Sequence, residues 1–263
     1  MALINMNHHS YYLGMDMPLT VLLPEKRGEE PTDYTNKTYP VLYLLHGHAD
    51  DNTAWIRKSN IELLAREQEL IVVMPSGHRG FYSNGKCSHL YFDYIAKELP
   101  IIISNFFHAS SKREDHYIAG LSMGGYGALK IGLTYPDQYA AIGAMSAAIN
   151  PFEAFRLSGK MFTVPDFMTN TSWIFGSEEE FLASDNHVYN LIDHLASSGA
   201  KFPRIYHSCG EQDPLYSLNC QLKDKFETLG NHLDYQWQSL PGEHNWDFWD
   251  PELKKIMSFM KLI

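Results

Sequence analysis

The sequence has few cysteines, no dense cluster of basic residues and no long apolar run. Its three cysteines, among 263 residues, show neither a CxxC spacing nor an even disulfide framework, which favours reduced thiols in a cytoplasmic protein over a redox role. The formal net charge of −10 argues against nucleic-acid binding, because phosphate contacts need clustered lysine and arginine. Small neutral molecules are the partners that this charge balance favours.

Targeting and membrane signals are also missing. The first residues, MALINMNHHSYYLGMDMP, contain neither a basic segment nor an apolar core, so no secretory signal is expected. No apolar run reaches the roughly 18 residues that a membrane span requires. These absences predict an intracellular protein that works without a membrane. The sequence leaves open whether the chain forms a homo-oligomer.

The composition is that of a globular protein with a sizeable core. Hydrophobic residues make up 44% of the chain and charged residues 20%. No internal repeat, low-complexity tract or long linker is visible. We therefore expect a single domain over residues 1–263. The irregular stretch at about 150–186, with its prolines, glycines and aromatics, is expected to form a lid-like insertion over the edge of a sheet.

Short apolar runs alternate with amphipathic helical patterns along the chain. This alternation indicates βαβ units and hence an α/β fold, a mostly parallel sheet covered by helices on both faces. Functional sites in such sheets form at the carboxyl ends of the strands. Strands are predicted at 19–24, 39–47, 70–75, 116–121, 139–148, 204–210 and 233–240. Helices are predicted at 59–68, 91–107, 123–135, about 186–198, about 216–229 and about 246–261.

A serine flanked by glycines stands where a predicted strand meets a predicted helix. Residues 120–124 are GLSMG, which fits the G-x-S-x-G pattern of a nucleophile elbow. Such a turn projects the hydroxyl of Ser122 into the cleft, and side chains at Gly120 and Gly124 would collide with the adjoining strand and helix. The helix also directs its N–H groups at the site, which favours an oxyanion there. The pattern alone also fits a glycine-rich turn with an idle serine; its position favours a nucleophile.

A serine nucleophile needs a base, and five histidines follow Ser122 in the chain. In this fold the chain order is Ser, then Asp or Glu, then His. His244 lies in a glycine-containing loop after the last predicted strand, from which an imidazole can swing over the serine, so it is the predicted base. Core, capping or solvated positions suit the other four: His187, His194, His207 and His232.

The acid is expected in the loop after the last strand but one. Asp213 follows the glycine at which that strand ends and precedes a proline, which suits a fixed carboxylate. Its role would be to hold the imidazole tautomer and to stabilise the imidazolium. Glu211 is the near competitor. Asp247 and Asp250 are closer to His244 in sequence, but they fall on the following predicted helix.

Two backbone amides are predicted to stabilise the oxyanion. One is the N–H of Met123, the residue after the nucleophile. The other is the N–H of His48 in LLHGHAD, where Gly47 lets the backbone approach the site. An alternative is that His46 and His48 bind zinc together with one of the aspartates that follow, but no third ligand has a clear spacing. We therefore predict no metal.

With these residues identified, the chain resembles the tributyrin esterase branch of the esterase D superfamily. That superfamily also contains S-formylglutathione hydrolases, feruloyl esterases and mycolyltransferases of the antigen 85 type. The resemblance covers nearly the whole chain and is weakest over 150–190. It is carried by YPVLYLLHG, SNIE, LIVVMP, YIAGLSMGGYGALK, CGEQD and GEHNWDFW.

The resemblance implies an α/β-hydrolase fold and a carboxylic ester hydrolase that cleaves short-chain acyl esters, such as acetyl and butyryl esters, without a cofactor. It implies Ser122 as nucleophile, Asp213 as acid and His244 as base, with His48 and Met123 as oxyanion donors. Related esterases usually carry an apolar residue where this chain has His48, which makes the pocket more polar. Alternatives with the same triad are a feruloyl or cinnamoyl esterase, an S-formylglutathione hydrolase and an acyltransferase. A non-catalytic binding protein would be expected to lack a triad residue.

The sequence says less about the walls of the substrate pocket. Phe81 and Tyr82 lie in a long predicted loop, and Trp246 follows the predicted base by two residues; these three are the candidates. The aromatics of the predicted insertion either form a lid over the cleft or bury the insertion against the body. They are Phe152, Phe155, Phe162, Phe167 and Trp173.

Overall fold

An eight-stranded sheet organises the chain in a computed structural model, which describes residues 1–25, 37–159 and 166–263. Its strands are β1 (Ala2–Ser10), β2 (Met15–Leu23), β3 (Val41–Leu45), β4 (Ile71–Pro75), β5 (His116–Leu121), β6 (Ala141–Met145), β7 (Arg204–Gly210) and β8 (Tyr235–Leu240). Their order is β1-β2-β4-β3-β5-β6-β7-β8. β2 pairs antiparallel with β1 and β4, and every pairing from β4 to β8 is parallel. The predicted mostly parallel sheet is confirmed.

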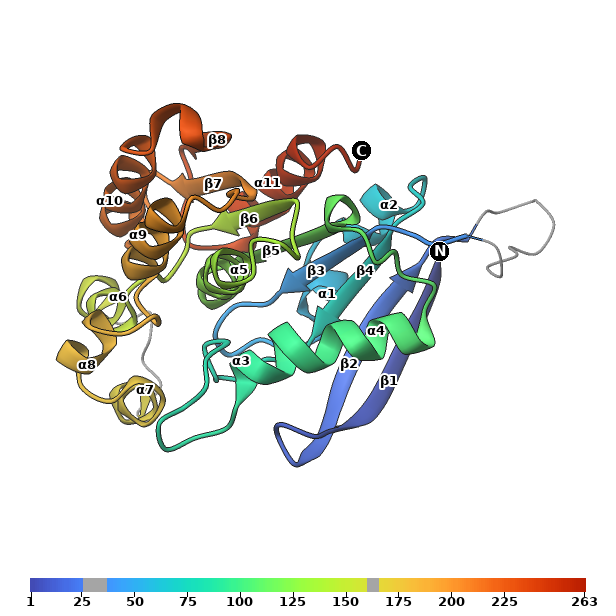
Figure 1. Cartoon of the computed structure of the whole chain (residues 1–263), viewed down its shortest axis with the longest axis horizontal. Helices are drawn as coiled ribbons and strands as arrows, with labels where there is room; N and C mark the ends of the chain where they lie inside the picture. Colours follow the sequence, from blue (N-terminus) through green and yellow to red (C-terminus); the bar gives the residue numbers. More distant parts are fainter. Residues whose placement is uncertain (26–36, 160–165) are drawn as a thin grey trace.

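Helices cover both faces of this sheet (Figure 1). They are α1 (Ala54–Lys58), α2 (Ile61–Ala65), α3 (Tyr91–Asp93), the π-helical turn η1 (Tyr94–Glu98), α4 (Leu99–Phe106), η2 (Arg113–Asp115), α5 (Met123–Thr134), α6 (Pro151–Ser158), α7 (Phe167–Phe175), α8 (Glu178–Leu182), α9 (Val188–Ser198), α10 (Tyr216–Glu227), η3 (Gly230–His232) and α11 (Trp246–Phe259). α1, α2 and α11 lie on one face, and α4, α5, α9 and α10 lie on the other. None of the described helices is both long and apolar enough to cross a bilayer.

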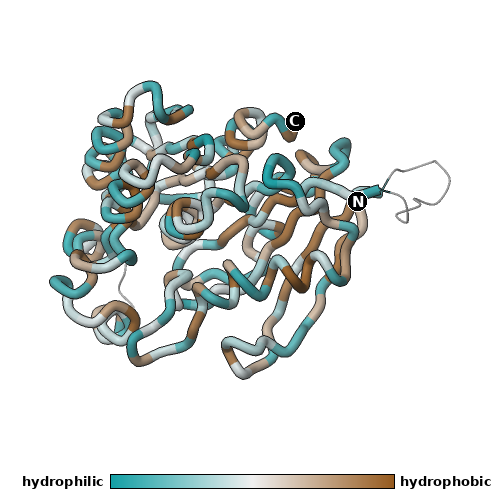
Figure 2. The backbone as a smooth tube through the Cα atoms, viewed as in Figure 1, coloured by the Kyte–Doolittle hydropathy of each residue, from teal (hydrophilic) through white to brown (hydrophobic). Residues whose placement is uncertain are grey.

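The core forms on both sides of the central strands, which are the most hydrophobic parts of the backbone in Figure 2. In β3 every residue is buried, and successive side chains point to opposite faces. Val41, Tyr43 and Leu45 pack on the side of α4 and α5. Leu42 and Leu44 pack on the side of α1 and α11. A strand buried on both faces is typical of a parallel sheet, and it holds the residues that follow it in a fixed place.

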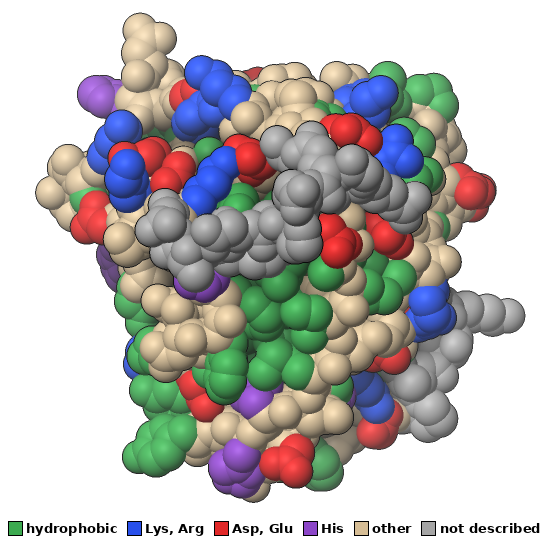
Figure 3. Space-filling model, turned by 90° about the vertical axis from the view of Figure 1, so that its right-hand side faces the viewer, with side chains coloured by type: hydrophobic (Ala, Val, Ile, Leu, Met, Phe, Trp, Pro, Cys, Tyr) green, Lys and Arg blue, Asp and Glu red, His purple; other side chains and the backbone are tan. Residues whose placement is uncertain are grey.

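The amino-terminal strand β1 was not predicted from the sequence. Its residues alternate between half-buried and exposed, and its apolar side chains Ile4 and Met6 pack on the core. β1 is the edge of the sheet, and Figure 3 shows the face of the molecule on that side, where hydrophobic side chains gather near histidines. Asn5 and Asn7 occupy exposed positions of this alternation, but neither they nor the two histidines that follow favour a strand.

The predicted helix 91–107 is present, but it changes its hydrogen-bond pattern midway. The N–H of Leu99 bonds to the carbonyl of Tyr94, five residues back, so that η1 is wider than an α-helix. Pro100 follows directly and has no N–H to donate. The π-helical turn therefore lets the chain pass the proline without ending the helix.

The predicted insertion contains α6, α7 and α8, which lie at the end of the molecule away from β1 (Figure 1). Phe152 and Phe167 are buried, and Phe155 stacks on Phe167 with ring centroids 5.4 Å apart. Trp173 is 56% exposed. Phe162 lies outside the described residues. Most of these aromatic side chains thus pack inside the protein and do not face solvent. A lid function for the insertion stays a prediction.

Candidate active site

Three side chains from distant parts of the chain meet at the carboxyl ends of β5, β7 and β8. The Oγ of Ser122 lies 2.9 Å from Nε2 of His244, and Nδ1 of His244 lies 2.8 Å from Oδ2 of Asp213. Because a carboxylate only accepts hydrogen bonds, Nδ1 carries the proton and Nε2 accepts from the serine. The structure therefore brings together all three residues predicted for the triad, in an order that allows proton transfer.

The turn at Ser122 has the shape expected of a nucleophile elbow. Ser122 has φ +54° and ψ −115°, a conformation that side chains rarely adopt. Its carbonyl accepts from the N–H groups of Tyr126 and Ala148, at 3.0 and 3.1 Å, which holds the strained residue in place. A Cβ on Gly124 would overlap the carbonyl of Leu45. The predicted steric need for glycine at this position is confirmed.

Trp249, which sequence reasoning did not single out, packs against the imidazole of His244. The two rings are perpendicular, with centroids 4.9 Å apart. The indole Nε1 of Trp249 donates to Oγ of Ser146 at 3.1 Å, which fixes the plane of the indole. The only sequence signal was an aromatic residue one turn into the helix that follows the base. Trp249 thus limits the rotation of the imidazole.

The residues predicted for the oxyanion hole lie on the two sides of Ser122. Met123 begins α5, so its N–H is at the amino end of that helix. On the other side, a Cβ placed on Gly47 would lie 3.7 Å from Cβ of Ser122. The loop that carries His48 is therefore adjacent to the nucleophile.

His48 carries a neutral imidazole in a partly buried aromatic surrounding. Nε of Arg79 donates to Nε2 of His48 at 3.3 Å, and burial together with this guanidinium lowers the pKa of His48 to about 4. The imidazole contacts Phe81 and Phe167, with ring centroids 5.6 and 5.1 Å away. Arg79 also forms an ion pair with Asp166 at 3.0 Å. Arg79 was not predicted, because it reaches His48 from a different loop.

The zinc alternative does not fit the environment of His46. Nδ1 of His46 donates to the carbonyl of Gly47 at 2.7 Å, and Nε2 accepts from the N–H of Gly77 at 2.8 Å. Both nitrogens are occupied, so neither is free for a metal. Among the described residues, no group of three His, Cys, Asp or Glu side chains is placed to hold a metal ion.

The three candidates for pocket walls occupy different environments. Phe81 and Tyr82 are almost fully buried, and the hydroxyl of Tyr82 donates to the carbonyl of His46 at 2.9 Å. Trp246 is partly exposed and contacts Trp55 edge to face, with centroids 5.0 Å apart. Of the three, Trp246 is the one with exposed surface near the base, and its role as a pocket wall stays a prediction.

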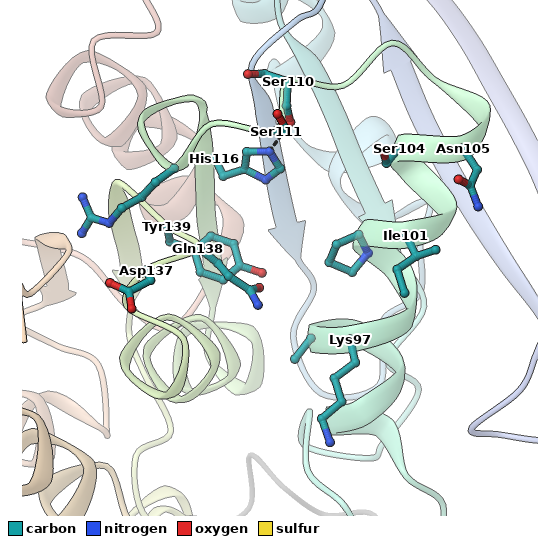
Figure 4. Close-up of a pocket in the computed structure, with 13 residues that line it drawn as sticks. Lys97, Ile101, Ser104, Asn105, Ser110, Ser111, His116, Asp137, Gln138 and Tyr139 are labelled. Carbon is teal, nitrogen blue, oxygen red and sulfur yellow. Dashed lines mark hydrogen bonds between the residues drawn. The ribbon is translucent and has the colours of Figure 1, made fainter.

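A cavity of about 570 Å³ lies near the amino ends of β5 and β6 (Figure 4). It is bounded by α4 and by the residues around the starts of β5 and β6, including His116 and Tyr139. Nε2 of His116 donates to the carbonyl of Ser110 at 2.5 Å. Since Ser122 follows the carboxyl end of β5, this cavity is separate from the candidate site.

The elbow serine, its hydrogen-bonded imidazole and the order of the strands define a serine hydrolase with the α/β-hydrolase fold. The chain belongs to the esterase family described as "Putative esterase", whose family model matches residues 10–260. It is therefore a carboxylic ester hydrolase of the esterase D superfamily. The resemblance found in the sequence is confirmed at that level.

The relatives are similar to this chain over its whole length. An "Acetyl esterase" of Caldicellulosiruptor saccharolyticus is 28% identical over 274 residues, which cover 100% of this chain and 99% of the relative. The solved structure of FphF, a fluorophosphonate-binding serine hydrolase of Staphylococcus aureus, is 33% identical, with a TM-score of 0.88 and 98% of each chain covered. The S-formylglutathione hydrolase FrmB of Staphylococcus aureus is also 33% identical, with a TM-score of 0.84 and the same coverage.

Proposed function

We propose that this serine esterase hydrolyses short-chain acyl esters, such as acetyl and butyryl esters, through an acyl-enzyme on Ser122. The observation that carries the proposal is the continuous hydrogen-bonded row from Asp213 through His244 to Ser122, at 2.8 and 2.9 Å. The preference for short acyl groups is supported by the acetyl esterase relative. The three free cysteines support a cytoplasmic location.

In the proposed mechanism, His244 removes the proton of Ser122 as Oγ attacks the ester carbonyl. Asp213, whose side chain is 0% exposed, stabilises the imidazolium and takes no proton. The N–H groups of His48 and Met123 donate to the tetrahedral oxyanion. The imidazolium then protonates the leaving alcohol, and a water activated by His244 hydrolyses the acyl-enzyme.

The aromatic residues around His48 support a role for the predicted insertion as one wall of the site within a single domain. α7 contributes Phe167, which contacts the imidazole of His48. The Arg79–Asp166 ion pair joins the residue before α7 to the loop after β4. In this arrangement α6–α8 form a lid-like cover beside the candidate oxyanion loop rather than an independent unit.

The first test is the Ser122→Ala variant with p-nitrophenyl acetate as substrate. We expect turnover to disappear, because the substitution removes the Oγ that attacks the ester. The temperature of thermal unfolding should stay as in the wild type, because only one hydroxyl group is lost. A fluorophosphonate probe should label the wild type and not the variant. Ser208→Ala is the matched control, since the buried hydroxyl of Ser208 has no hydrogen-bond partner among the described residues. Near-normal turnover by Ser122→Ala would refute the proposal.

A series of substrates tests the specificity. Acetyl, butyryl and longer p-nitrophenyl esters, a feruloyl ester and S-formylglutathione should be compared by kcat/KM. We expect the acetyl and butyryl esters to give the highest values. A higher value for the feruloyl ester or for S-formylglutathione would assign the same triad to that substrate. Product analysis with an added alcohol would reveal acyl transfer.

A further inference from the structure

His46 is buried beside the candidate oxyanion loop, and its imidazole makes two hydrogen bonds. The N–H of Gly77 donates to Nε2 at 2.8 Å, so Nε2 carries no proton. The neutral imidazole must then carry its proton on Nδ1, which donates to the carbonyl of Gly47 at 2.7 Å. Burial lowers the pKa of His46, which keeps the ring neutral. The environment thus selects one tautomer of His46.

The carbonyl that accepts from His46 belongs to the peptide unit whose N–H is the proposed oxyanion donor. In a trans peptide, the C=O and N–H bonds point in opposite directions. No cis peptide occurs among the described residues. While Nδ1 of His46 holds the carbonyl of Gly47 on one side, the N–H of His48 must point to the other. The N–H of Asp50 also donates to this carbonyl, at 3.2 Å.

Tyr82 contacts both the backbone and the imidazole of His46. Its hydroxyl donates to the carbonyl of His46 at 2.9 Å, and its ring packs edge to face on the imidazole with centroids 5.9 Å apart. A Cβ on Gly77 would lie 2.5 Å from the Tyr82 ring, and one on Gly127 would also overlap it. The tyrosine is thereby held between the loop after β4 and the nucleophile helix α5.

The loop that contributes Tyr82 is strained. His78, Phe81 and Tyr82 have φ values of +42°, +48° and +47°, in the left-handed region that favours glycine. Such strain persists only where surrounding contacts hold it, and it is concentrated at functional sites. Because β3 and β4 are parallel neighbours, their carboxyl ends place His46 beside this loop. The strained backbone serves to bring the Tyr82 hydroxyl and the Gly77 amide to His46.

We infer that His46, held by Gly77 and Tyr82, is a positioning residue that sets the orientation of the Gly47–His48 peptide in the oxyanion hole. The inference rests on the proposed function, because it assigns the His48 N–H to transition-state stabilisation. It goes further by giving the LLHGHAD motif a second role: one histidine supplies the donor and the other orients it. Loss of an oxyanion donor lowers kcat by about 10²–10³-fold.

The test compares two substitutions of His46. His46→Leu removes both nitrogens, so that of these two hydrogen bonds to the Gly47 carbonyl only the longer one, from the N–H of Asp50, remains and the Gly47–His48 peptide is held less firmly. We expect kcat for p-nitrophenyl acetate to fall by about 10²-fold with KM within about threefold. His46→Asn keeps an N–H donor close to the position of Nδ1, and we expect it to retain kcat within about tenfold of the wild type. Equal losses in the two variants, or no loss in His46→Leu, would overturn the inference.

Tyr82→Phe tests the same inference with little change of volume. It deletes only the hydroxyl that bonds to His46, and we expect a loss of several-fold in kcat. Tyr94→Phe is the matched control, because the Tyr94 hydroxyl is buried without a hydrogen-bond partner among the described residues. If His46→Leu does not fold, Tyr82→Phe decides: a kcat equal to that of Tyr94→Phe would reject the positioning role.

A second readout separates positioning from stability. A trifluoromethyl ketone that forms a tetrahedral adduct with Ser122 places its oxygen in the oxyanion hole, so its affinity should fall in each variant by the same factor as kcat/KM. A merely structural role would lower the unfolding temperature without this parallel loss. If Ser122→Ala is inactive and His46→Leu is fully active, the inference fails while the proposed function stands. An active Ser122→Ala would defeat the proposed function itself.

Discussion

Asp213 uses both carboxylate oxygens, and this determines which tautomer of His244 is present. Oδ2 accepts from Nδ1 of His244 at 2.8 Å, while Oδ1 accepts from the N–H of Leu215 at 2.8 Å. The carboxylate is completely buried, so no solvent competes for either oxygen. A side chain at this position must therefore offer an acceptor in two directions at once.

Asp213→Asn offers only one such acceptor. The backbone N–H of Leu215 is fixed and needs an acceptor, so the amide oxygen of the asparagine accepts from it. The amide NH2 then faces His244. Nδ1 must then accept, which moves the imidazole proton to Nε2 and leaves no base for Ser122. We expect kcat to fall by about 10⁴-fold with an unchanged fold. Steady-state kinetics and circular dichroism check this; a loss below tenfold would contradict the proposed role of Asp213.

At the residue scale, the sequence predicted the groups that chain order identifies. Ser122 was predicted from its glycines together with its place between a predicted strand and a predicted helix, and His244 and Asp213 from their places after the last strands. Trp249 was not predicted, because its contact with His244 depends on how the start of α11 turns the indole towards the imidazole. Arg79 was not predicted, because it contacts His48 from another loop and no spacing encodes that contact.

At the scale of elements, the close packing of α5 against β3 holds the two sides of the candidate site together. A Cβ on Gly124 would overlap the carbonyls of Leu45 and His46. These carbonyls belong to the end of β3 and to the candidate oxyanion loop. The gap between the helix and the loop is thus set by the absence of one methyl group.

Gly124→Ala should move α5 away from this loop. We expect at least about 10²-fold lower kcat, because a displacement near 1 Å is enough to misplace Ser122. Gly199→Ala is the control: Gly199 has φ +71° at the end of α9, and a Cβ there would meet no atom within 4 Å. It should cost roughly 1 kcal/mol in the free energy of unfolding and leave kcat unchanged. Equal kcat values for the two variants would show that the helix–loop distance does not matter.

Strands buried on both faces were predicted well, whereas the edge strand β1 and the short helix α1 were not. β3, β4 and β5 are continuous apolar runs bounded by turns, so their pattern was unambiguous. β1 was missed because its asparagines and histidines do not favour a strand, and α1 because it is only five residues long. The helices of the insertion owe their arrangement to aromatic contacts between distant residues, which local periodicity does not show.

For the molecule as a whole, buried neutral histidines link stability to pH. Burial lowers the pKa of His207 to about 4, and that of His48 is lowered to about 4 as well. In the unfolded chain both groups titrate near 6.5. Between about pH 6.5 and pH 4 the unfolded state therefore binds more protons than the folded state. The free energy of unfolding is therefore higher above pH 6.5 and falls as the solution is acidified towards pH 4.

His207 is the clearest place to measure this effect, because it is fully buried within β7 and is not one of the proposed catalytic residues. Its Nε2 donates to Oδ1 of Asn219 at 2.8 Å, and its Nδ1 accepts from the hydroxyl of Tyr235 at 3.0 Å. His207→Gln keeps an amide donor and acceptor but does not titrate. The measurement is the free energy of unfolding, from urea titrations, at several pH values between 4.5 and 6. We expect its slope against pH to be smaller in the variant than in the wild type by up to about 1.4 kcal/mol per pH unit. The exposed His232, changed to Gln, should leave the slope as it is; equal slopes for the two variants would show that His207 is not a source of the acid sensitivity.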